Sequence, residues 1–329
     1  MHRWTYLTEV RAIAPELWPA GTAQGYRLRY RDGDRISSGS LFLPACAPAS
    51  MPLLTWAHCF VGLDEHNAPS RRGLPRVERE HLAAWLARGF AVAAADFQGL
   101  DGCGVHPFPA TRQIAADIMG ICPAARELDD RLEKTVLAGG FCQGARAVLH
   151  AAAGPDLNYR GAVALAPPSY APYYTMVTGH ADLPADALIL VLLAGMRAAD
   201  PGFRPQRYLN RRGAQLLDAV TSLSVKQMRE LLAPYTVGDL GAQRLTRHQP
   251  VVQALTRCRD FAPSATKSVL VCTMDADPIS PRGGAQRGCD QLARHGTDVI
   301  HRAYTGGGHL DVLRLAADDT VAWALERAV

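Results

Sequence analysis

The sequence predicts an α/β protein with a mostly parallel central sheet, helices on its faces and one large helical insertion. Short apolar runs alternate with amphipathic stretches along most of the 329 residues, a pattern typical of parallel strands joined by helices. One long interval breaks this alternation and carries only helix-like stretches. The composition, 48% hydrophobic and 20% charged residues, indicates an ordinary globular chain and excludes a disordered or fibrous one.

The apolar runs are the predicted strands. A hairpin comes first: Gly25–Tyr30 alternates apolar and basic residues, Asp32-Gly33 supplies the turn, and Ser40–Pro44 closes the pair. The later predicted strands are Pro52–Ala57, Phe90–Ala95, Thr135–Gly139, Gly161–Ala166, Ser268–Met274 and Val299–Tyr304. The predicted helices are Val77–Arg88, Thr111–Leu132, Gln143–Ala153, Gly283–His295 and Val312–Arg327.

The interval from Pro168 to Ala265 has no convincing strand and is punctuated by Pro and Gly. We interpret it as a helical lid, residues 168–265, inserted between a first core segment, 1–167, and a second, 266–329. Its most apolar run, Ala187–Met196, is about half of the ~20 residues that a membrane-spanning helix needs, so we expect a buried helix. Substrate selection is expected to reside in this lid.

Charge and targeting signals narrow the possible partners. The formal net charge is +4, and the basic residues are scattered rather than gathered in a block, which does not favour nucleic-acid binding. Met1–Val10 has no continuous apolar stretch before its first acidic residue, so no secretory signal is expected and a cytoplasmic location is predicted. The expected partner is a small-molecule substrate. The oligomeric state does not follow from the sequence.

Eight cysteines are present without a Cys-x-x-Cys pair, which favours free, mostly structural thiols in a reducing compartment. The group His58, Cys59 and His66 lacks the ligand spacing of zinc sites. We therefore predict no metal and no cofactor. Cys142 is the cysteine that does not fit a structural role.

The segment Gly140-Phe-Cys-Gln-Gly144 joins the predicted strand Thr135–Gly139 to a predicted helix. A strand, a sharp turn and a helix in this order are the setting of a nucleophile elbow, where flanking glycines let the central residue project above the sheet. The N–H groups at the start of the helix favour a thiolate at Cys142. We predict that Cys142 is a nucleophile; the alternative is a buried structural cysteine.

An acid and a histidine follow in the chain order that this type of site uses. Asp275-Ala-Asp277-Pro comes directly after the strand Ser268–Met274, and Gly306-Gly-Gly-His309 follows the strand Val299–Tyr304. We predict Asp277 as the acid, with Asp275 as the alternative, and His309 as the base. The backbone N–H of Gln143, the residue after the nucleophile, is predicted to be one oxyanion-hole donor.

Together these residues resemble the α/β-hydrolase fold and, within it, secretory lipases of the fungal lipase A type. The resemblance rests on Thr55-Trp-Ala-His-Cys-Phe-Val-Gly62, Asn67-Ala-Pro-Ser70, Asp96-Phe-Gln-Gly-Leu-Asp-Gly-Cys-Gly104 and His106-Pro-Phe. It implies this fold from the hairpin to the last helix and a lid after Pro168. It also implies Asp96 as the second oxyanion donor; the usual alternative in this fold is the loop after His58.

The departures from that family concern the chemistry. The family's nucleophile is Ser in Gly-Tyr-Ser-x-Gly-Gly, whereas this chain has Cys142 and Ala145. The family's His-Gly becomes His58-Cys59, and Asn67 replaces a cysteine. A cysteine in the elbow also resembles dienelactone hydrolases, which are shorter and lack a large lid.

We therefore predict an enzyme that uses Cys142, His309 and Asp277 for acyl transfer or hydrolysis on an ester or thioester of a small or natural-product-like molecule. Two other activities stay open: a lyase that eliminates acetate from an acetylated tetronate-type intermediate, by resemblance to hydrolase-like enzymes of natural-product pathways, and a dienelactone-hydrolase-like lactone hydrolysis. A degenerate hydrolase that only binds ligands is the non-enzymatic alternative.

Overall fold

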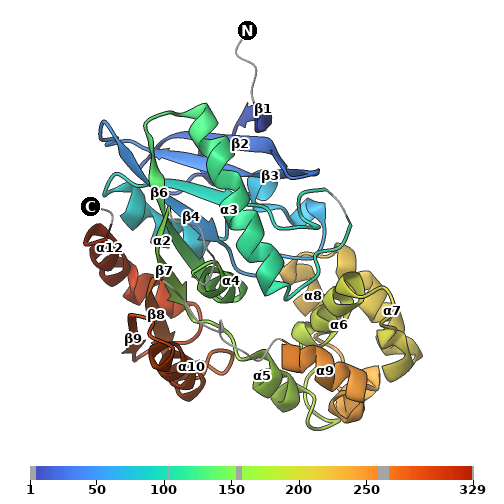
Figure 1. The fold of residues 1–329 in the computed structure, drawn as a ribbon. Helices are drawn as coiled ribbons and strands as arrows, with labels where there is room; N and C mark the ends of the chain where they lie inside the picture. Colours follow the sequence, from blue (N-terminus) through green and yellow to red (C-terminus); the bar gives the residue numbers. More distant parts are fainter. Residues whose placement is uncertain (1–4, 103, 153–157, 258–266, 328–329) are drawn as a thin grey trace.

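A nine-stranded sheet forms the centre of the computed structural model, which describes residues 5–102, 104–152, 158–257 and 267–327 (Figure 1). The strand order is β1-β2-β3-β5-β4-β6-β7-β8-β9. The strands are β1 (Leu7–Ala12), β2 (Thr22–Asp32), β3 (Arg35–Pro44), β4 (Met51–Ala57), β5 (Ala91–Ala95), β6 (Leu132–Phe141), β7 (Tyr159–Leu165), β8 (Ser268–Met274) and β9 (Val299–Tyr304). Following this order across the sheet, the pairings from β1 to β5 are antiparallel. All pairings from β5 to β9 are parallel.

Helices cover both faces of this sheet. Successive residues of each strand point to opposite faces, and apolar residues on both faces are buried under these helices. Leu53 of β4 belongs to the apolar cluster on one face, which also contains residues of α3 (Thr111–Leu128), α4 (Gln143–Ala151) and α10 (Arg282–Arg294). The next residue, Leu54, belongs to the cluster on the other face, which also contains residues of α2 (Arg76–Leu86), α11 (Asp311–Leu315) and α12 (Ala317–Leu325). The short helix α1 (Pro69–Arg72) lies in the loop between β4 and α2. The predicted mostly parallel, two-faced sheet is thus confirmed.

Three element predictions need correction. β1 was not predicted, since only its first residue, Leu7, is buried and the strand carries no apolar alternation. The single helix expected over Val312–Arg327 is two helices that meet at Ala316, whose φ of −93° and ψ of 1° depart from helical geometry. The helix expected to reach Leu132 ends at Leu128 because Leu132 begins β6.

The interval after β7 contains five α-helices within the described residues. They are α5 (Tyr170–Val177), α6 (Ala187–Ala199), α7 (Arg211–Ala219), α8 (Val225–Leu232) and α9 (Gln249–Arg257). They form one group beside the sheet (Figure 1). α6 is the centre of that group, with Ile189 through Met196 buried, as expected for a buried helix. No helix of the described residues is long and apolar enough to cross a membrane.

This helical group packs on the loops that follow the carboxyl ends of β4 and β5. Leu63 and Phe108 from those loops belong to its apolar core. Since β4, β5 and β6 run parallel, these loops lie at the same end of the sheet as Cys142, which follows β6. A lid function for residues 168–265 remains a prediction.

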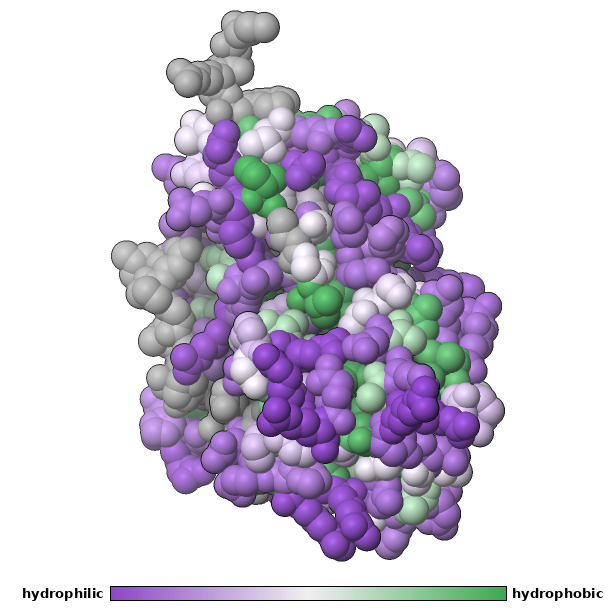
Figure 2. Space-filling model, turned by 90° about the vertical axis from the view of Figure 1, so that its right-hand side faces the viewer, coloured by the Kyte–Doolittle hydropathy of each residue, from purple (hydrophilic) through white to green (hydrophobic). Residues whose placement is uncertain are grey.

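Polar and charged side chains cover most of the face seen in Figure 2, with apolar residues in small groups between them. The large apolar side chains that are exposed among the described residues are scattered: Tyr6, Met176, Ile300 and Leu310.

Candidate active site

Cys142 occupies a strained turn between β6 and α4. Its φ of 56° and ψ of −118° lie outside the regions that L-residues normally adopt, as at a nucleophile elbow. Glycines permit the turn: a Cβ on Gly144 would lie 1.9 Å from the carbonyl oxygen of Ala57, and a Cβ on Gly140 would lie 2.6 Å from Gly144. The Cys142 N–H donates to the Leu165 carbonyl at 3.0 Å. The backbone therefore holds the thiol at the start of α4.

Asp277 and His309 come together at the adjoining strand ends. His309 Nδ1 lies 2.6 Å from Asp277 Oδ2, and the Asp277 carboxylate is fully buried. The other oxygen, Oδ1, accepts the backbone N–H groups of Ile279 at 2.9 Å and Ser280 at 3.0 Å. Asp275, the alternative acid, instead lies 3.1 Å from an Arg282 nitrogen at the surface. The geometry thus pairs His309 with Asp277 rather than with Asp275.

The His309 ring is held in place and carries a proton at neutral pH. It packs on the Phe141 ring with centroids 4.8 Å apart. Burial lowers its pKa, but the hydrogen bond to Asp277 and the contact with Cys59 outweigh burial and raise the pKa to about 9. His309 Nε2 is buried and has no well-oriented hydrogen bond to any described residue. The Cys59 thiol is the other side chain that interacts with this ring.

A second thiol, Cys59, joins this group. Interaction with Cys142 and burial raise the pKa of Cys59 well above its usual value, while the His309 side chain opposes the rise. The six cysteines in the described part of the chain, at positions 46, 59, 122, 142, 272 and 289, are free thiols. Cys103 and Cys258 lie outside the described residues. Cys59 is thus a neutral thiol in contact with both Cys142 and His309.

The backbone of Cys59 is anchored by a buried carboxyl group. Glu78 Oε1 accepts the Cys59 N–H at 3.0 Å, and Oε2 accepts the Trp56 indole N–H at 2.6 Å. Burial raises the pKa of Glu78 to about 7 despite these two hydrogen bonds. Because the Cys59 N–H is already used, the loop after His58 cannot offer that donor to an oxyanion.

The two predicted oxyanion donors differ in their surroundings. The N–H of Gln143 lies at the first position of α4, where backbone N–H groups lack helical partners. Asp96 is fully buried, and its carboxylate accepts hydrogen bonds from Ser38 Oγ at 2.6 Å, the Ser70 N–H at 3.0 Å and Ser70 Oγ. Burial raises the pKa of Asp96. Asp96 could donate to an oxyanion only when protonated, so this role stays a prediction.

Two buried histidines and the Gln143 side chain complete the group. His58 Nδ1 lies 2.6 Å from the Cys59 carbonyl, and its ring stacks on Phe97 at 3.8 Å. His106 Nδ1 lies 2.9 Å from the Gln98 carbonyl, and its ring centroid is 5.7 Å from that of Phe97. The Gln143 side chain interacts with His106 and raises its pKa, although burial lowers it more. These histidines line the same end of the sheet as Cys142.

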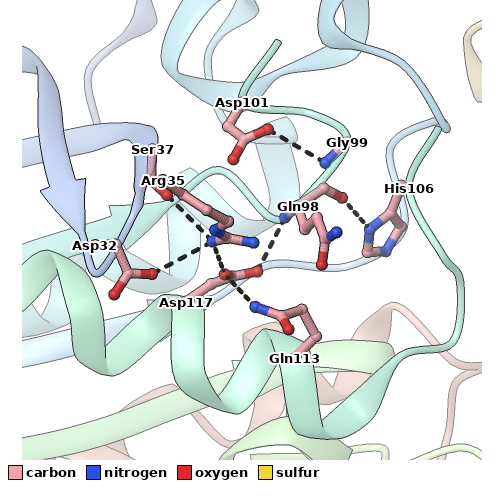
Figure 3. A network of polar contacts seen from close by, with 9 residues as sticks. All are labelled: Asp32, Arg35, Ser37, Gln98, Gly99, Asp101, His106, Gln113 and Asp117. Atoms are coloured by element: carbon pink, nitrogen blue, oxygen red, sulfur yellow. Dashed lines mark hydrogen bonds and ion pairs between the residues drawn. The ribbon is translucent and has the colours of Figure 1, made fainter. Parts of the chain in front are cut away.

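A polar network fixes the loop that carries His106 (Figure 3). Asp117 Oδ2 accepts the Gln98 N–H at 2.9 Å, and Asp117 Oδ1 lies 2.6 Å from an Arg35 nitrogen. Gln113 donates to the same carboxylate at 3.1 Å. The Gln98 carbonyl is thereby positioned to orient the His106 ring.

The sequence predicts no role for His106 or Glu78. It presents Cys59 only as a member of the group His58, Cys59 and His66, which lacks the ligand spacing of a metal site. The available signal for Cys59 was its place in His58-Cys59, where the resembling family has Gly. His106 was noted only as part of a motif. Glu78 carries no local signal, because its burial and its bond to the Cys59 N–H depend on tertiary packing.

Comparisons with known proteins support the fold. No protein-family model matches the sequence, and no curated protein matches it. Lipase A of Candida antarctica is similar in structure with a TM-score of 0.79 and 18% identity, over 98% of this chain and 81% of the lipase. The rice cell wall degrading esterase LipA from Xanthomonas oryzae has a TM-score of 0.72 and 15% identity, over 97% of each chain. The chain therefore has the α/β-hydrolase fold.

Proposed function

We propose that this chain is an enzyme that transfers or hydrolyses the acyl group of an ester or thioester through Cys142, His309 and Asp277. The observation that carries the proposal is the strained Cys142 turn beside the 2.6 Å Asp277–His309 pair. The fold shared with a lipase and an esterase agrees with ester chemistry.

The first step forms an acyl-enzyme. The Cys142 thiol gives its proton to His309 and reacts as a thiolate. The thiolate sulfur attacks the ester carbonyl carbon, and the carbonyl electron pair moves to oxygen. The Gln143 N–H stabilises this oxyanion, with protonated Asp96 as the second proposed donor. When the intermediate collapses, the carbon–oxygen bond to the alcohol breaks, and His309 gives its proton to the departing alkoxide.

The second step releases the acid. A water molecule, or another acceptor hydroxyl, attacks the thioester carbonyl while His309 takes its proton. The carbon–sulfur bond then breaks and restores the thiolate. Asp277 holds the His309 ring in one orientation and stabilises its charged form throughout, since Oδ1 is fixed by two backbone N–H groups.

One contact favours a second candidate, an acetate-eliminating lyase. The thiol that interacts with His309 is Cys59, so Cys142 and His309 need not act as nucleophile and base on one carbonyl. In an elimination, the Cys142–His309 pair takes a proton from the carbon next to a carbonyl. That electron pair forms a carbon–carbon double bond as the carbon–oxygen bond to acetate breaks. No covalent enzyme intermediate is required.

The test of the proposed function is ester cleavage by cysteine variants. With p-nitrophenyl butyrate as substrate, we expect Cys142→Ala to lose activity and Cys142→Ser to keep a small part of it, because a hydroxyl can attack when His309 assists. Cys46→Ser, at an exposed thiol, is the matched control and should retain wild-type activity. Equal activity in wild type and Cys142→Ala would refute a nucleophilic Cys142.

A further inference from the structure

We propose that Gln143, His106 and His58 form an uncharged hydrogen-bonding subsite beside Cys142, and that it binds a hydroxyl group on the acyl half of the substrate. This inference rests on the proposed acyl transfer and names the substrate class: hydroxylated acyl groups rather than plain aliphatic chains.

The first observation is a set of buried polar atoms with unused hydrogen-bonding capacity. Gln143 Oε1 and Nε2, His106 Nε2 and His58 Nε2 are all buried, and none has a well-oriented hydrogen bond within the described part of the chain. The residues themselves are at most 2% exposed. Native proteins pair such groups, and those left unpaired need an explanation such as a ligand or a water molecule.

The second observation is that these atoms belong to one group. The rings of His58 and His106 both lie against Phe97, with centroid distances of 3.8 Å and 5.7 Å. The Gln143 amide interacts with His106. The three residues follow the carboxyl ends of β4, β5 and β6, three neighbouring strands of the sheet. Gln143 is also the residue next to Cys142, and its N–H is the proposed oxyanion donor.

The hydrogen-bonding character of the subsite follows from the backbone. His58 Nδ1 and His106 Nδ1 each face a carbonyl oxygen, which can only accept, so Nδ1 carries the hydrogen in both rings. Burial lowers the pKa of both histidines, that of His58 to about 3, so the rings are neutral. Each Nε2 is therefore an acceptor. Figure 3 shows that the His106 Nε2 takes no part in the network that holds Nδ1.

These acceptors select the chemistry of the ligand. A hydroxyl group donates to Nε2 or to Gln143 Oε1 and can accept from Gln143 Nε2. A carboxylate has no hydrogen to donate and would meet acceptor nitrogens. An unsubstituted alkyl chain would leave the buried acceptors unpaired, and a polar site discriminates against such ligands.

The kinetic test compares p-nitrophenyl butyrate with its 2- and 3-hydroxy analogues. We expect at least one hydroxy ester to exceed butyrate in kcat/KM by about five- to tenfold, as one additional hydrogen bond of typical strength predicts. Gln143→Met and His106→Phe should reduce this ratio towards one. Gln286→Leu, on the surface of α10, is the control and should preserve the ratio. If no hydroxy ester exceeds butyrate, the subsite proposal is wrong.

A binding test separates the subsite from the reaction. Ligand-observed NMR on Cys142→Ala measures the affinities of butyramide and its 2-, 3- and 4-hydroxy analogues, which require no catalysis. Tighter binding of one hydroxyamide, lost in the same protein carrying Gln143→Met, supports the subsite even if wild type cleaves no ester. Equal affinities overturn the subsite, whereas ester cleavage by wild type would still support the proposed function.

Discussion

His309 Nδ1 and Asp277 Oδ2 lie 2.6 Å apart, and this contact determines the charge of the ring at neutral pH. Burial alone would favour a neutral imidazole, but the carboxylate raises the pKa of His309 to about 9 with help from Cys59. The pair therefore supplies a proton donor that interacts with the Cys59 thiol.

Asp277→Asn is expected to lower turnover by about 10³- to 10⁴-fold, because the amide presents the wrong hydrogen-bonding partner to His309. Asn keeps an oxygen that can accept the Ile279 and Ser280 N–H groups, so the fold should be retained. Asp275→Asn is the matched control, since Asp275 pairs with Arg282 at the surface. Steady-state kinetics compare the turnover of the two variants. A larger loss in Asp275→Asn would identify Asp275 as the acid that pairs with His309.

The dependence of activity on pH should report the His309 proton. In the proposed mechanism a protonated His309 gives its proton to the departing alkoxide, so kcat/KM should fall as the pH rises through the His309 pKa of about 9. In Asp277→Asn the residual activity should begin to fall at lower pH, because burial then lowers the His309 pKa without opposition from the carboxylate. An activity that instead increases through pH 9 would indicate that His309 must be neutral to act.

Glu78 should make folding less favourable as the pH rises. The pKa of Glu78 is about 7 in the fold and 4.5 in the reference state. The stabilisation of the fold by neutral Glu78 is therefore fully present below about pH 4.5 and is lost as the pH rises through about 7. The free energy of unfolding should decrease between pH 5 and pH 8 by about 2–3 kcal/mol more in wild type than in Glu78→Gln. Urea unfolding at both pH values measures this difference. Equal decreases would show that Glu78 is not the titrating group.

Iodoacetamide should label Cys142 before the other cysteines near pH 7. Cys142 is the proposed nucleophile at the strained turn before α4, whereas the raised pKa of Cys59 disfavours its thiolate. Peptide mapping over time gives the order, with the exposed Cys46 as the internal reference for accessibility. Faster labelling of Cys59 or Cys103 than of Cys142 would contradict this assignment.

Much of the fold was predictable because buried parallel strands are continuous apolar runs in the sequence. Ser268–Met274 and Val299–Tyr304 have the predicted bounds, and the elbow was visible as Gly140-Phe-Cys-Gln-Gly144 between a strand and a helix. The edge strand Leu7–Ala12 was not predictable, since its residues are mostly exposed and it forms by pairing with β2.

The site was predictable only where chain order or a local motif carries information. Asp277 and His309 follow strand ends in the order that the fold uses, and local sequence favoured Asp277 over Asp275. The contacts of Cys59 with Cys142, and of Gln143 with His106, join loops that are distant in sequence. Neither composition nor periodicity indicates such contacts, because they depend on the register of neighbouring strands.

The central claim is that Cys142 forms a covalent thioester, and rapid-quench intact-mass spectrometry tests it most directly. Wild type mixed with a p-nitrophenyl ester should gain the mass of one acyl group within the first turnover, and peptide mapping should place that group on Cys142. Cys142→Ala should gain no mass, and His309→Ala should gain it more slowly. Steady release of p-nitrophenol by wild type without an acyl-enzyme at any quench time would contradict a covalent role for Cys142.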